Sequence, residues 1–402
     1  MSTAASETPY TIISADCHAG GNMAAYEQYL DPTWKDEFKD WRGQYKNPYR
    51  DLQDDGRTRN WDNDRRQSEL AADGVVAEIV FPNTVPPFYP AGALVARPPT
   101  DKADYDRRLA GIWAHNRWLK DWCADYPDQR CGLPQIFVDD LDDSIKILEW
   151  AAAEGFRSFM LPHIPPDSGM LGYWSPHWDR LWQTVTELDL VVTQHGGGGG
   201  PDYGKTPASW LIFLMEVPFF AHRNLAHLIL SGVFERHPTM RYVMTEQGVA
   251  WLVEELRRMD AYHAEMKRGG RIGELGFDAD LVLPLKPSEY FDRNVWIGAS
   301  FPSPSEAAVM ATIGTHKMMW GNDYPHHEGT YPYSLQSLQR SFADWDEPAL
   351  RQILAENAAA VYGFDLARLA PIAADHGFTP TQVATPLAEI PTDATSPAFF
   401  RP

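Results

Sequence analysis

The sequence predicts an eight-stranded α/β barrel, a (β/α)8 TIM-like fold, from three observations. Eight short runs rich in apolar residues alternate with longer runs of helical character, which is the pattern of βα units around a parallel sheet. The chain has 402 residues, of which 44% are hydrophobic, and this is enough for one large domain of the class. Metal-ligating side chains directly follow three of the eight runs. A doubly wound open sheet is the structural alternative.

The predicted strands and helices alternate along most of the chain. The predicted strands span residues 10–15, 75–81, 133–138, 156–161, 188–193, 241–245, 295–298 and 317–320. The predicted helices span residues 103–125, 140–154, 176–187, 208–236, 249–267, 305–313 and 347–357. The helix over 208–236 carries an apolar set at helical spacing, and Pro218 is expected to kink it. Its apolar set is Leu211, Leu214, Phe219, Leu225, Leu228 and Leu230.

Two segments fit neither role. Residues 36–70 form a long insertion after the first predicted strand and are rich in aromatic and charged side chains. Such an insertion either shapes the substrate site or forms a surface segment whose aromatic side chains pack against one another. Residues 371–402 are rich in Pro, Ala and Thr and end in two phenylalanines before the last two residues. This composition predicts an extended C-terminal arm that either wraps on a neighbouring subunit or is disordered. The barrel itself is then expected to span residues 1–370.

Composition excludes several classes of function. The formal net charge of -20 argues against nucleic acid or an anionic membrane as a partner, because the long-range field would repel both. The three cysteines, Cys17, Cys123 and Cys131, have no CxxC spacing, which argues against a disulfide scaffold or a structural zinc module. No apolar stretch is long enough to span a bilayer, and no signal peptide is apparent. A cytoplasmic protein is therefore expected.

Four candidate metal ligands follow predicted strands. Asp16 and His18 end the first strand, where side chains two residues apart project to the same side. His195 ends the fifth strand, and Asp323 follows the eighth. A barrel brings the carboxyl ends of its strands to one mouth, so these residues would converge. Two imidazoles and two carboxylates suit one zinc or manganese ion and leave a coordination position for water or substrate.

Four segments together resemble a known family. They are Asp16-Cys17-His18, the QHGG sequence at 194–197, the LSGVFERHP sequence at 230–238 and the WGNDYPH sequence at 320–326. The pattern resembles the amidohydrolase-2 branch of the amidohydrolase superfamily, which includes aminocarboxymuconate semialdehyde decarboxylase and the resorcylate and carboxyvanillate decarboxylases. The resemblance extends over residues 10–365.

The resemblance implies roles for the four candidate ligands. Asp16, His18, His195 and Asp323 would hold one divalent ion, Zn or Mn, and Asp323 would also transfer a proton. A carboxylate beside a divalent ion can accept a proton and return it to a carbon or a leaving group. The family also implies a small-molecule substrate and a homodimer or higher homo-oligomer.

One position departs from the family pattern. Family members commonly place a His at the end of the sixth strand, whereas the corresponding run here is Met244-Thr245-Glu246-Gln247-Gly248. Glu246 would act as a general base, as a metal ligand or as an anchor for a ligand His. Its alternative role is a capping carboxylate at the start of the following helix.

Side chains near the ligands are expected to contact the substrate. His326 and His327 follow the turn that contains Asp323, and Tyr324 belongs to the same loop. The segment from Phe81 to Phe88 directly follows the second predicted strand and would give an apolar wall for a ring or an acyl chain. For His163, His222 and His227 a structural role is favoured.

Three functions remain for this site. The first is a metal-dependent decarboxylase of an aromatic or unsaturated carboxylic acid, with Asp323 as the proton donor. The second is a metal-dependent hydrolase of an amide, ester, lactone or C–C bond that uses metal-activated water. The third, a non-catalytic ligand-binding barrel, is disfavoured by the four metal-compatible residues. Since the sixth strand lacks the family His, the sequence favours the decarboxylase slightly.

Overall fold

The computed structural model describes residues 7–45, 55–83, 85–90 and 97–401. The predicted insertion at 36–70 therefore lies partly outside the described residues, because 46–54 are not among them. Within the described part of the chain, no helix is both long enough and apolar enough to cross a membrane.

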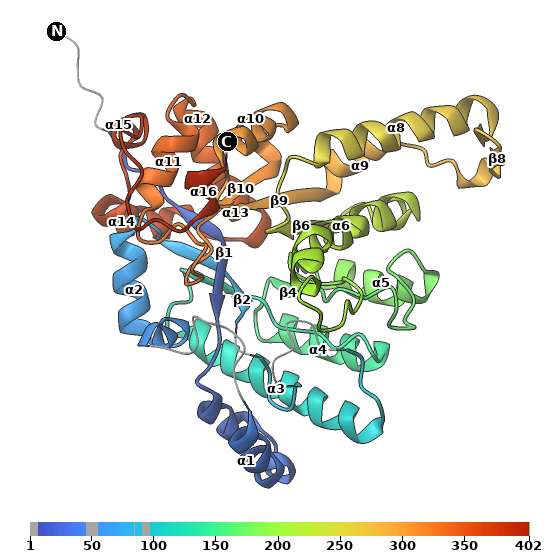
Figure 1. Ribbon diagram of the computed structural model, residues 1–402, viewed down its shortest axis with the longest axis horizontal. Coiled ribbons are helices and arrows are strands. Elements are labelled where there is room, and N and C mark those ends of the chain that lie inside the picture. The colour runs from blue at the N-terminus through green and yellow to red at the C-terminus, as the bar shows by residue number, and fades with distance from the viewer. Residues whose placement is uncertain (1–6, 46–54, 84, 91–96, 402) are drawn as a thin grey trace.

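Eight parallel strands form the centre of the molecule, and helices surround them (Figure 1). One sheet has the order β1-β2-β3 and the other β10-β9-β6-β5-β4. Backbone hydrogen bonds join the sheets at both seams, from Met160 N to Pro134 O (2.9 Å) and from His18 N to Tyr324 O (2.7 Å). The predicted (β/α)8 architecture is thereby confirmed. The strands are β1 Ile13–Ala19, β2 Ala77–Pro82, β3 Arg130–Gly132, β4 Ser158–Met160, β5 Val191–His195, β6 Arg241–Thr245, β9 Val295–Ser300 and β10 Met318–Gly321.

The third strand is displaced from its predicted place. The sequence predicts it over residues 133–138, but β3 ends at Gly132, and in the buried run after it only an isolated bridge between Gln135 and Met160 continues the pairing. The side chain of Asn116 replaces the missing ladder: its Oδ1 accepts from Gln135 N (2.9 Å) and its Nδ2 donates to Gln135 O (2.8 Å). Because a side chain satisfies the backbone here, a buried apolar run need not be a strand.

The helices largely follow the predicted order. The predicted helix over 208–236 is divided, because Gly232 adopts a left-handed conformation (φ 73°) between α6 and α7. Among the helices that the sequence did not predict, α1 and α2 lie in the insertion, α9 precedes β9 and α11 follows β10. The longer helices are α1 Lys35–Gln44, α2 Asn63–Ala72, α3 Lys102–Ala124, α4 Leu141–Ala153, α5 Asp179–Glu187, α6 Ser209–Leu230, α8 Leu252–Gly269, α9 Pro287–Asn294, α10 Pro304–Ile313 and α11 Ser334–Phe342; the shorter α7, α12 and α13 span Val233–Arg236, Glu347–Arg351 and Asn357–Tyr362.

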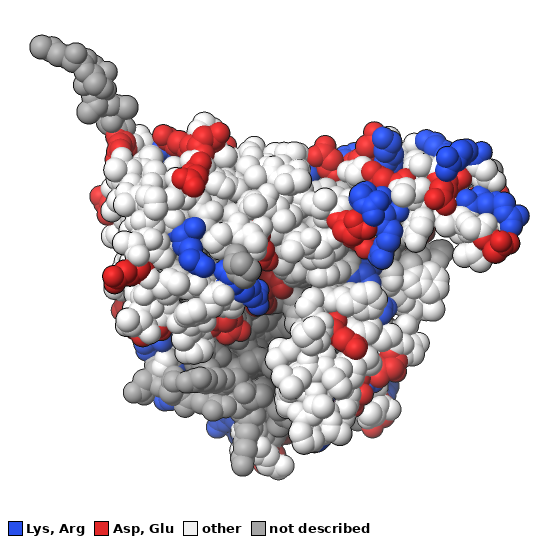
Figure 2. Space-filling model, turned by 45° about the horizontal axis from the view of Figure 1, so that its top comes forward, with Lys and Arg blue, Asp and Glu red and all other residues white. Residues whose placement is uncertain are grey.

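An arm projects from the barrel between β6 and β9. It consists of α8 and the hairpin of β7 (Arg271–Ile272) and β8 (Leu275–Gly276), and Figure 1 shows it extending away from the strands. Figure 2 shows acidic and basic side chains gathered on this arm. Opposite charges one turn apart, such as Glu254 and Arg257 (2.6 Å), stabilise an exposed helix of this kind modestly.

The C-terminal segment packs on its own barrel, so the predicted extended arm is wrong. It contains α14 (Leu366–His376), α15 (Pro380–Val383) and α16 (Pro397–Phe400), and α15 and α16 contact α11 (Figure 1). Val383 and Phe399 are buried, and Arg340 Nε donates to Ala398 O at 3.1 Å. The predicted boundary at residue 370 falls inside α14. The apolar residues of this segment bury surface against the same chain, which stabilises the folded arrangement.

Candidate active site

A bulge in β1 orients the first two candidate ligands. The pairing register between β1 and β2 shifts between Ser14 and Cys17, and such a bulge re-aims the side chains beyond it. Asp16 and His18 lie on the same face of the strand and point into the mouth of the barrel, whereas Cys17 packs in the core. Gly321 of β10 accommodates this strand, since a Cβ atom there would lie 2.7 Å from Asp16 Cβ.

The structure brings the four predicted ligands together. Asp16 Oδ1 lies 3.3 Å from His18 Nε2 and 3.3 Å from His195 Nε2. Asp323 Oδ1 lies 3.2 Å from His18 Nε2. Side chains from β1, β5 and the turn after β10 thus meet at one point, as expected for residues at the carboxyl ends of barrel strands.

The atoms that meet there lack ordinary hydrogen-bond partners. Among the described residues, Asp16 Oδ1, His18 Nε2, His195 Nε2 and both carboxylate oxygens of Asp323 are buried without a hydrogen bond. Buried polar atoms are normally satisfied, so a cluster of such atoms facing one another indicates an absent partner. Two imidazole nitrogens and two carboxylates fit a zinc or manganese ion.

Neighbouring groups hold the candidate ligands in place. Ser300 Oγ, at the end of β9, donates to Asp16 Oδ2. His195 Nδ1 donates to Gly196 O at 3.0 Å, which leaves the Nε2 lone pair directed at the cluster. The buried Arg66 of α2 donates from Nη1 to His18 O at 2.9 Å. Outer contacts of this kind commonly orient metal ligands.

Asp323 lies in a turn with a left-handed backbone (φ 58°). Its backbone N–H donates to Asp16 O at 2.9 Å, which links the turn to β1. The neighbouring Asn322 accepts from Ser14 Oγ at 2.9 Å and is fully buried. The strained turn is therefore held by β1 itself, and strain of this kind persists only when surrounding contacts determine it.

Glu246 completes the wall of the site beside His195. Its Oε2 lies 3.3 Å from His195 Nε2, its backbone N–H donates to Gly298 O (3.1 Å), and its φ is 55°. The following helix α8 begins at Leu252 with Trp251 as its N-cap. The capping role considered for Glu246 is therefore wrong, because the residue lies outside the first turn of the helix.

The electrostatics of the cluster favour added positive charge. Burial opposes charge on His195, yet the carboxylates of Glu246 and Asp16 raise its pKa to about 9. Burial, together with the charges of Asp323 and Asp16, raises the pKa of Glu246 to about 8. Burial alone would raise the pKa of Asp16, but the neighbouring His195 and His18 hold it below its usual range. A divalent cation would compensate the same carboxylates.

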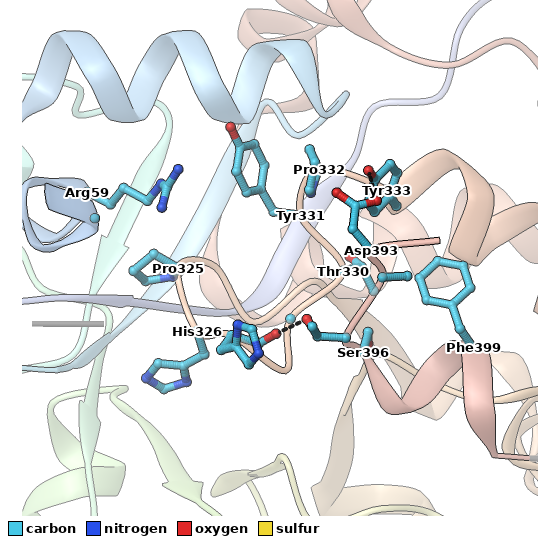
Figure 3. A pocket seen from close by; sticks show the side chains of 15 residues that line it. Arg59, Pro325, His326, Thr330, Tyr331, Pro332, Tyr333, Asp393, Ser396 and Phe399 are labelled. Carbon is cyan, nitrogen blue, oxygen red and sulfur yellow. Dashed lines mark hydrogen bonds between the residues drawn. The ribbon is translucent and has the colours of Figure 1, made fainter. Parts of the chain in front are cut away.

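The two histidines after Asp323 differ in whether they reach the ligand cluster. His326 Nδ1 lies 2.8 Å from Asp323 Oδ1, and its ring lies 3.9 Å from that of His18. His327 lies at a separate pocket of about 290 Å³, and Figure 3 shows this pocket from close by. That pocket is lined by Arg59, Tyr331 and Tyr333, among others, and His326 borders it as well. Of the two, only His326 also lines the cavity at the cluster.

Two further predicted contacts lie away from the cluster. Tyr324 is fully buried, and its Oη donates to Glu69 Oε2 at 2.6 Å. Phe88 packs among aromatic rings, 5.9 Å from Trp34 and 6.0 Å from Phe38. Neither residue lines the cavity. Phe88 lies outside the insertion, and Phe38 and Trp41 of α1 supply apolar partners for it.

An open cavity of about 410 Å³ lies over the ligand cluster. Phe81 forms part of its wall, with its ring 4.6 Å from that of His195. Most other lining side chains are apolar, and they include Ile112, Ile136, Phe137, Val138, Met160, Leu161, Met170 and Phe213. Such a wall suits the body of an aromatic or aliphatic ligand.

Several polar residues of the cavity were not predicted as site residues. His163 borders the cavity and donates from Nε2 to His195 O at 2.5 Å. Asn83 accepts from His326 Nε2 at 3.1 Å. Asp139 also lines the cavity. All three follow predicted strands directly, and that position was the available signal.

Comparisons with known proteins identify the family of this chain. The amidohydrolase family model matches residues 32–364. The chain is 24% identical over 314 residues to a 2-amino-3-carboxymuconate-6-semialdehyde decarboxylase of Dictyostelium discoideum. The matched region covers 76% of this chain and 77% of that protein.

Solved structures of similar fold include aromatic acid decarboxylases. The 5-carboxyvanillate decarboxylase of Sphingomonas paucimobilis is 19% identical, with a TM-score of 0.63 over 89% of this chain and 100% of that one. The enzyme of the same name from Novosphingobium aromaticivorans, crystallised with manganese and a nitrobenzoic acid, is 17% identical, with a TM-score of 0.65 over 89% and 97%. The family resemblance of the sequence motifs is thereby confirmed. Since the family match covers most of its length, this chain belongs to the amidohydrolase family.

Proposed function

We propose that the protein is a metal-dependent decarboxylase of an aromatic or unsaturated carboxylic acid. The observation that carries the proposal is the cluster of unpaired ligand atoms from Asp16, His18, His195 and Asp323 beneath an apolar cavity. Decarboxylases of aromatic acids among the similar structures, one of them holding manganese, support it.

The four clustered residues would hold one zinc or manganese ion. When bound, such an ion supplies a Lewis acid that attracts the substrate carboxylate and a neighbouring oxygen. The apolar wall around Phe81 would hold the body of the substrate and exclude water from the reacting carbon.

Asp323 is the proposed proton donor. In its protonated form, the carboxyl transfers its proton to the substrate carbon that carries the carboxylate. The bond from that carbon to the carboxylate then breaks, its electron pair returns to the substrate, and CO2 leaves. The bare carboxylate of Asp323 takes up a proton from solvent to restore the starting state. The buried position of Asp323 and its contact with His326 would fix the direction of transfer.

Labelled water separates this reaction from hydrolysis. Manganese-loaded protein is incubated with a panel of hydroxybenzoates, their esters and their amides in water enriched in deuterium and in heavy oxygen. Decarboxylation puts solvent deuterium on the carbon that lost CO2, whereas hydrolysis of an amide, ester or lactone puts solvent oxygen into the product. Deuterated product from the wild type, and none from Asp323→Asn, is expected. Heavy oxygen in the product would instead establish the hydrolase.

The proposed assembly is a homodimer or higher homo-oligomer. The first half of α6 exposes large apolar side chains, notably Leu211 (67% exposed) and Met215 (79% exposed). The others on this face are Trp210, Ile212, Leu214 and Phe219. A patch of this kind marks a protein interface, and a second copy of this chain would cover it. Phe213 of the same helix lines the cavity, so assembly would also stabilise one wall of the site.

We also propose that the substrate is a small molecule and that the protein is cytoplasmic. The net charge of -20 disfavours nucleic acid and anionic membranes as partners. The three cysteines are free, as is common in a reducing compartment. Measurement of binding to duplex DNA and to anionic vesicles, with no retention of the protein by either, would support this part of the proposal.

A further inference from the structure

The cavity carries a carboxylate that takes no part in the ligand cluster. Asp139 lies in the loop after β3 and lines the cavity. Among the described residues, no side chain from elsewhere in the chain donates a hydrogen bond to its carboxylate. Burial raises the pKa of Asp139, with the opposing charge of Arg108 acting to lower it. Asp139 is partly buried, so its carboxylate can accept a hydrogen bond from a ligand that enters the cavity.

Asp139 lies in the sector of the barrel without candidate ligands. In the ring of strands, β2, β3 and β4 form a continuous sector, while the ligand residues come from β1, β5 and the turn after β10. Tyr89, from the loop after β2, and Arg108 of α3 border the cavity in the same sector. The cavity thus has two polar regions, joined by apolar walls.

The two arginines that line the cavity, Arg97 and Arg108, are engaged by other groups. Arg108 Nη2 lies 2.6 Å from Asp104 Oδ2, and its Nη1 donates to Arg97 O at 2.6 Å. Arg97 itself pairs with Asp167 at 2.9 Å. The acceptor capacity of Asp139 is therefore left for a ligand.

The volume of the cavity exceeds what one ring requires. A cavity of about 150 Å³ holds a single benzene ring, whereas this one measures about 410 Å³. A carboxylic acid held at the ligand cluster has room for a second ring, or a chain of similar size, along the apolar wall.

We infer that the substrate is an acid of about two-ring size that bears a hydroxyl or ammonium donor at its far end, and that Asp139 selects it by accepting that hydrogen bond. This inference rests on the proposed function, because it assumes that the acid's carboxylate binds at the ligand cluster. Asp139 is thus a specificity-determining residue, and it takes no part in the breaking of bonds.

Binding of matched acids tests the inference. Titration calorimetry on the manganese-loaded full chain compares benzoate, a biphenyl carboxylate and the same biphenyl acid with a para-hydroxyl or a para-aminomethyl group on the far ring. The plain biphenyl acid should bind more tightly than benzoate, because it covers more of the apolar wall. At least one donor-bearing acid should bind about tenfold or more tightly than the plain biphenyl acid, as expected for a hydrogen bond to a charged group. The hydroxyl and aminomethyl forms tell which donor is preferred.

Two variants identify the residue responsible. Asp139→Ala should remove the preference for the donor while leaving the affinity of the plain biphenyl acid within about twofold. Asp142→Ala is the matched control, because this nearby carboxylate is 66% exposed and pairs with Arg180 on the surface. The control should keep the preference of the wild type.

The outcomes separate this inference from the proposed function. Equal affinities for donor-bearing and plain biphenyl acids, a preference that survives Asp139→Ala, or benzoate bound as tightly as the biphenyl acid would each overturn the inference. A donor preference lost in Asp139→Ala supports the inference even where none of the acids is decarboxylated, and that absence of turnover would count against the proposed function alone. Failure of all four acids to bind would contradict both.

Discussion

The carboxylate of Glu246 and the imidazole of His195 face each other across 3.3 Å, from Oε2 to Nε2. The same nitrogen lies 3.3 Å from Asp16 Oδ1. Because His195 Nδ1 already donates to Gly196 O (3.0 Å), its Nε2 is directed at two carboxylates at once. A cation shared among these three groups would explain the arrangement, and we propose that Glu246 supports the metal site as a ligand or as an anchor.

Replacing Glu246 by Gln should weaken metal binding. The change keeps the shape of the side chain and removes its charge, and loss of a group that supports a metal site commonly reduces metal affinity about 10- to 100-fold. Manganese titration of the metal-free protein measures the effect. Glu254→Gln is the control, since Glu254 is exposed on α8 and pairs with Arg257. Equal manganese affinities for the wild type and Glu246→Gln would remove Glu246 from the site.

Substitution of Gly321 by Ala should displace Asp16. The new Cβ atom would lie 2.7 Å from Asp16 Cβ and 3.0 Å from Asp16 N, so β1 must shift. Overpacking of this kind typically lowers the free energy of unfolding by about 1–3 kcal/mol, and the shift should also reduce manganese affinity. Gly276→Ala, where the added Cβ would have no neighbour within 4 Å, should change neither quantity. Unaltered manganese binding by Gly321→Ala would show that the contact does not position Asp16.

The stability of the protein should fall in mild acid because of His115. Burial lowers the pKa of this histidine from 6.5 to about 3. Below pH 6.5 the unfolded chain therefore takes up a proton on His115 that the folded chain does not. The free energy of unfolding falls as the pH falls towards the pKa that His115 has in the folded protein. From pH 6.5 to about pH 5 the loss from this residue is roughly 2 kcal/mol.

His115→Asn keeps a polar partner for Tyr26, whose Oη lies 2.8 Å from His115 Nδ1, but it cannot titrate. The free energy of unfolding from urea denaturation should depend less steeply on pH in this variant than in the wild type. Parallel curves for the two proteins between these pH values would contradict the assignment.

A charge on the exposed face of α6 should disrupt the proposed oligomer. Met215→Glu places a carboxylate at a site that is 79% exposed in one chain, where burial against a second copy would be costly. Sedimentation velocity should find the wild type as a dimer or larger species and Met215→Glu as a monomer. Leu275→Glu, at an equally apolar and exposed position on the β7–β8 hairpin, should leave the assembly intact. A monomeric wild type would contradict the proposed oligomer.

The positions of the candidate ligands could be predicted because each of them follows a predicted strand. Apolar runs followed by Asp16, His18, His195 and Asp323 located the ligand cluster, because strand ends meet in a barrel whatever their distance along the chain. Phe88 and Tyr324 could not be placed in the same way. Both follow strands closely, yet a positive φ at Phe88 (70°) and the hydrogen bond from Tyr324 to Glu69 direct them into the core.

Tertiary contacts explain the other differences. The segment after β3 is not a strand because Asn116 satisfies its backbone. The C-terminal arm folds back because Val383 and Phe399 become buried on this chain. Ser300 faces the site because of the register of β9, and Asp139 faces it because of the conformation of the loop after β3. Pairings of this kind depend on distant residues, so composition and periodicity alone cannot reveal them.

The metal content of the purified protein shows whether the four clustered residues form a metal site. Protein prepared without chelator and analysed by mass spectrometry for its elements should contain close to one zinc or manganese ion per chain. His195→Ala, which removes a ligand without adding a charge, should lose that ion together with activity, while His327→Ala, outside the cluster, should keep it. Active wild-type protein free of divalent metal, or equal metal content in the wild type and His195→Ala, would contradict the account.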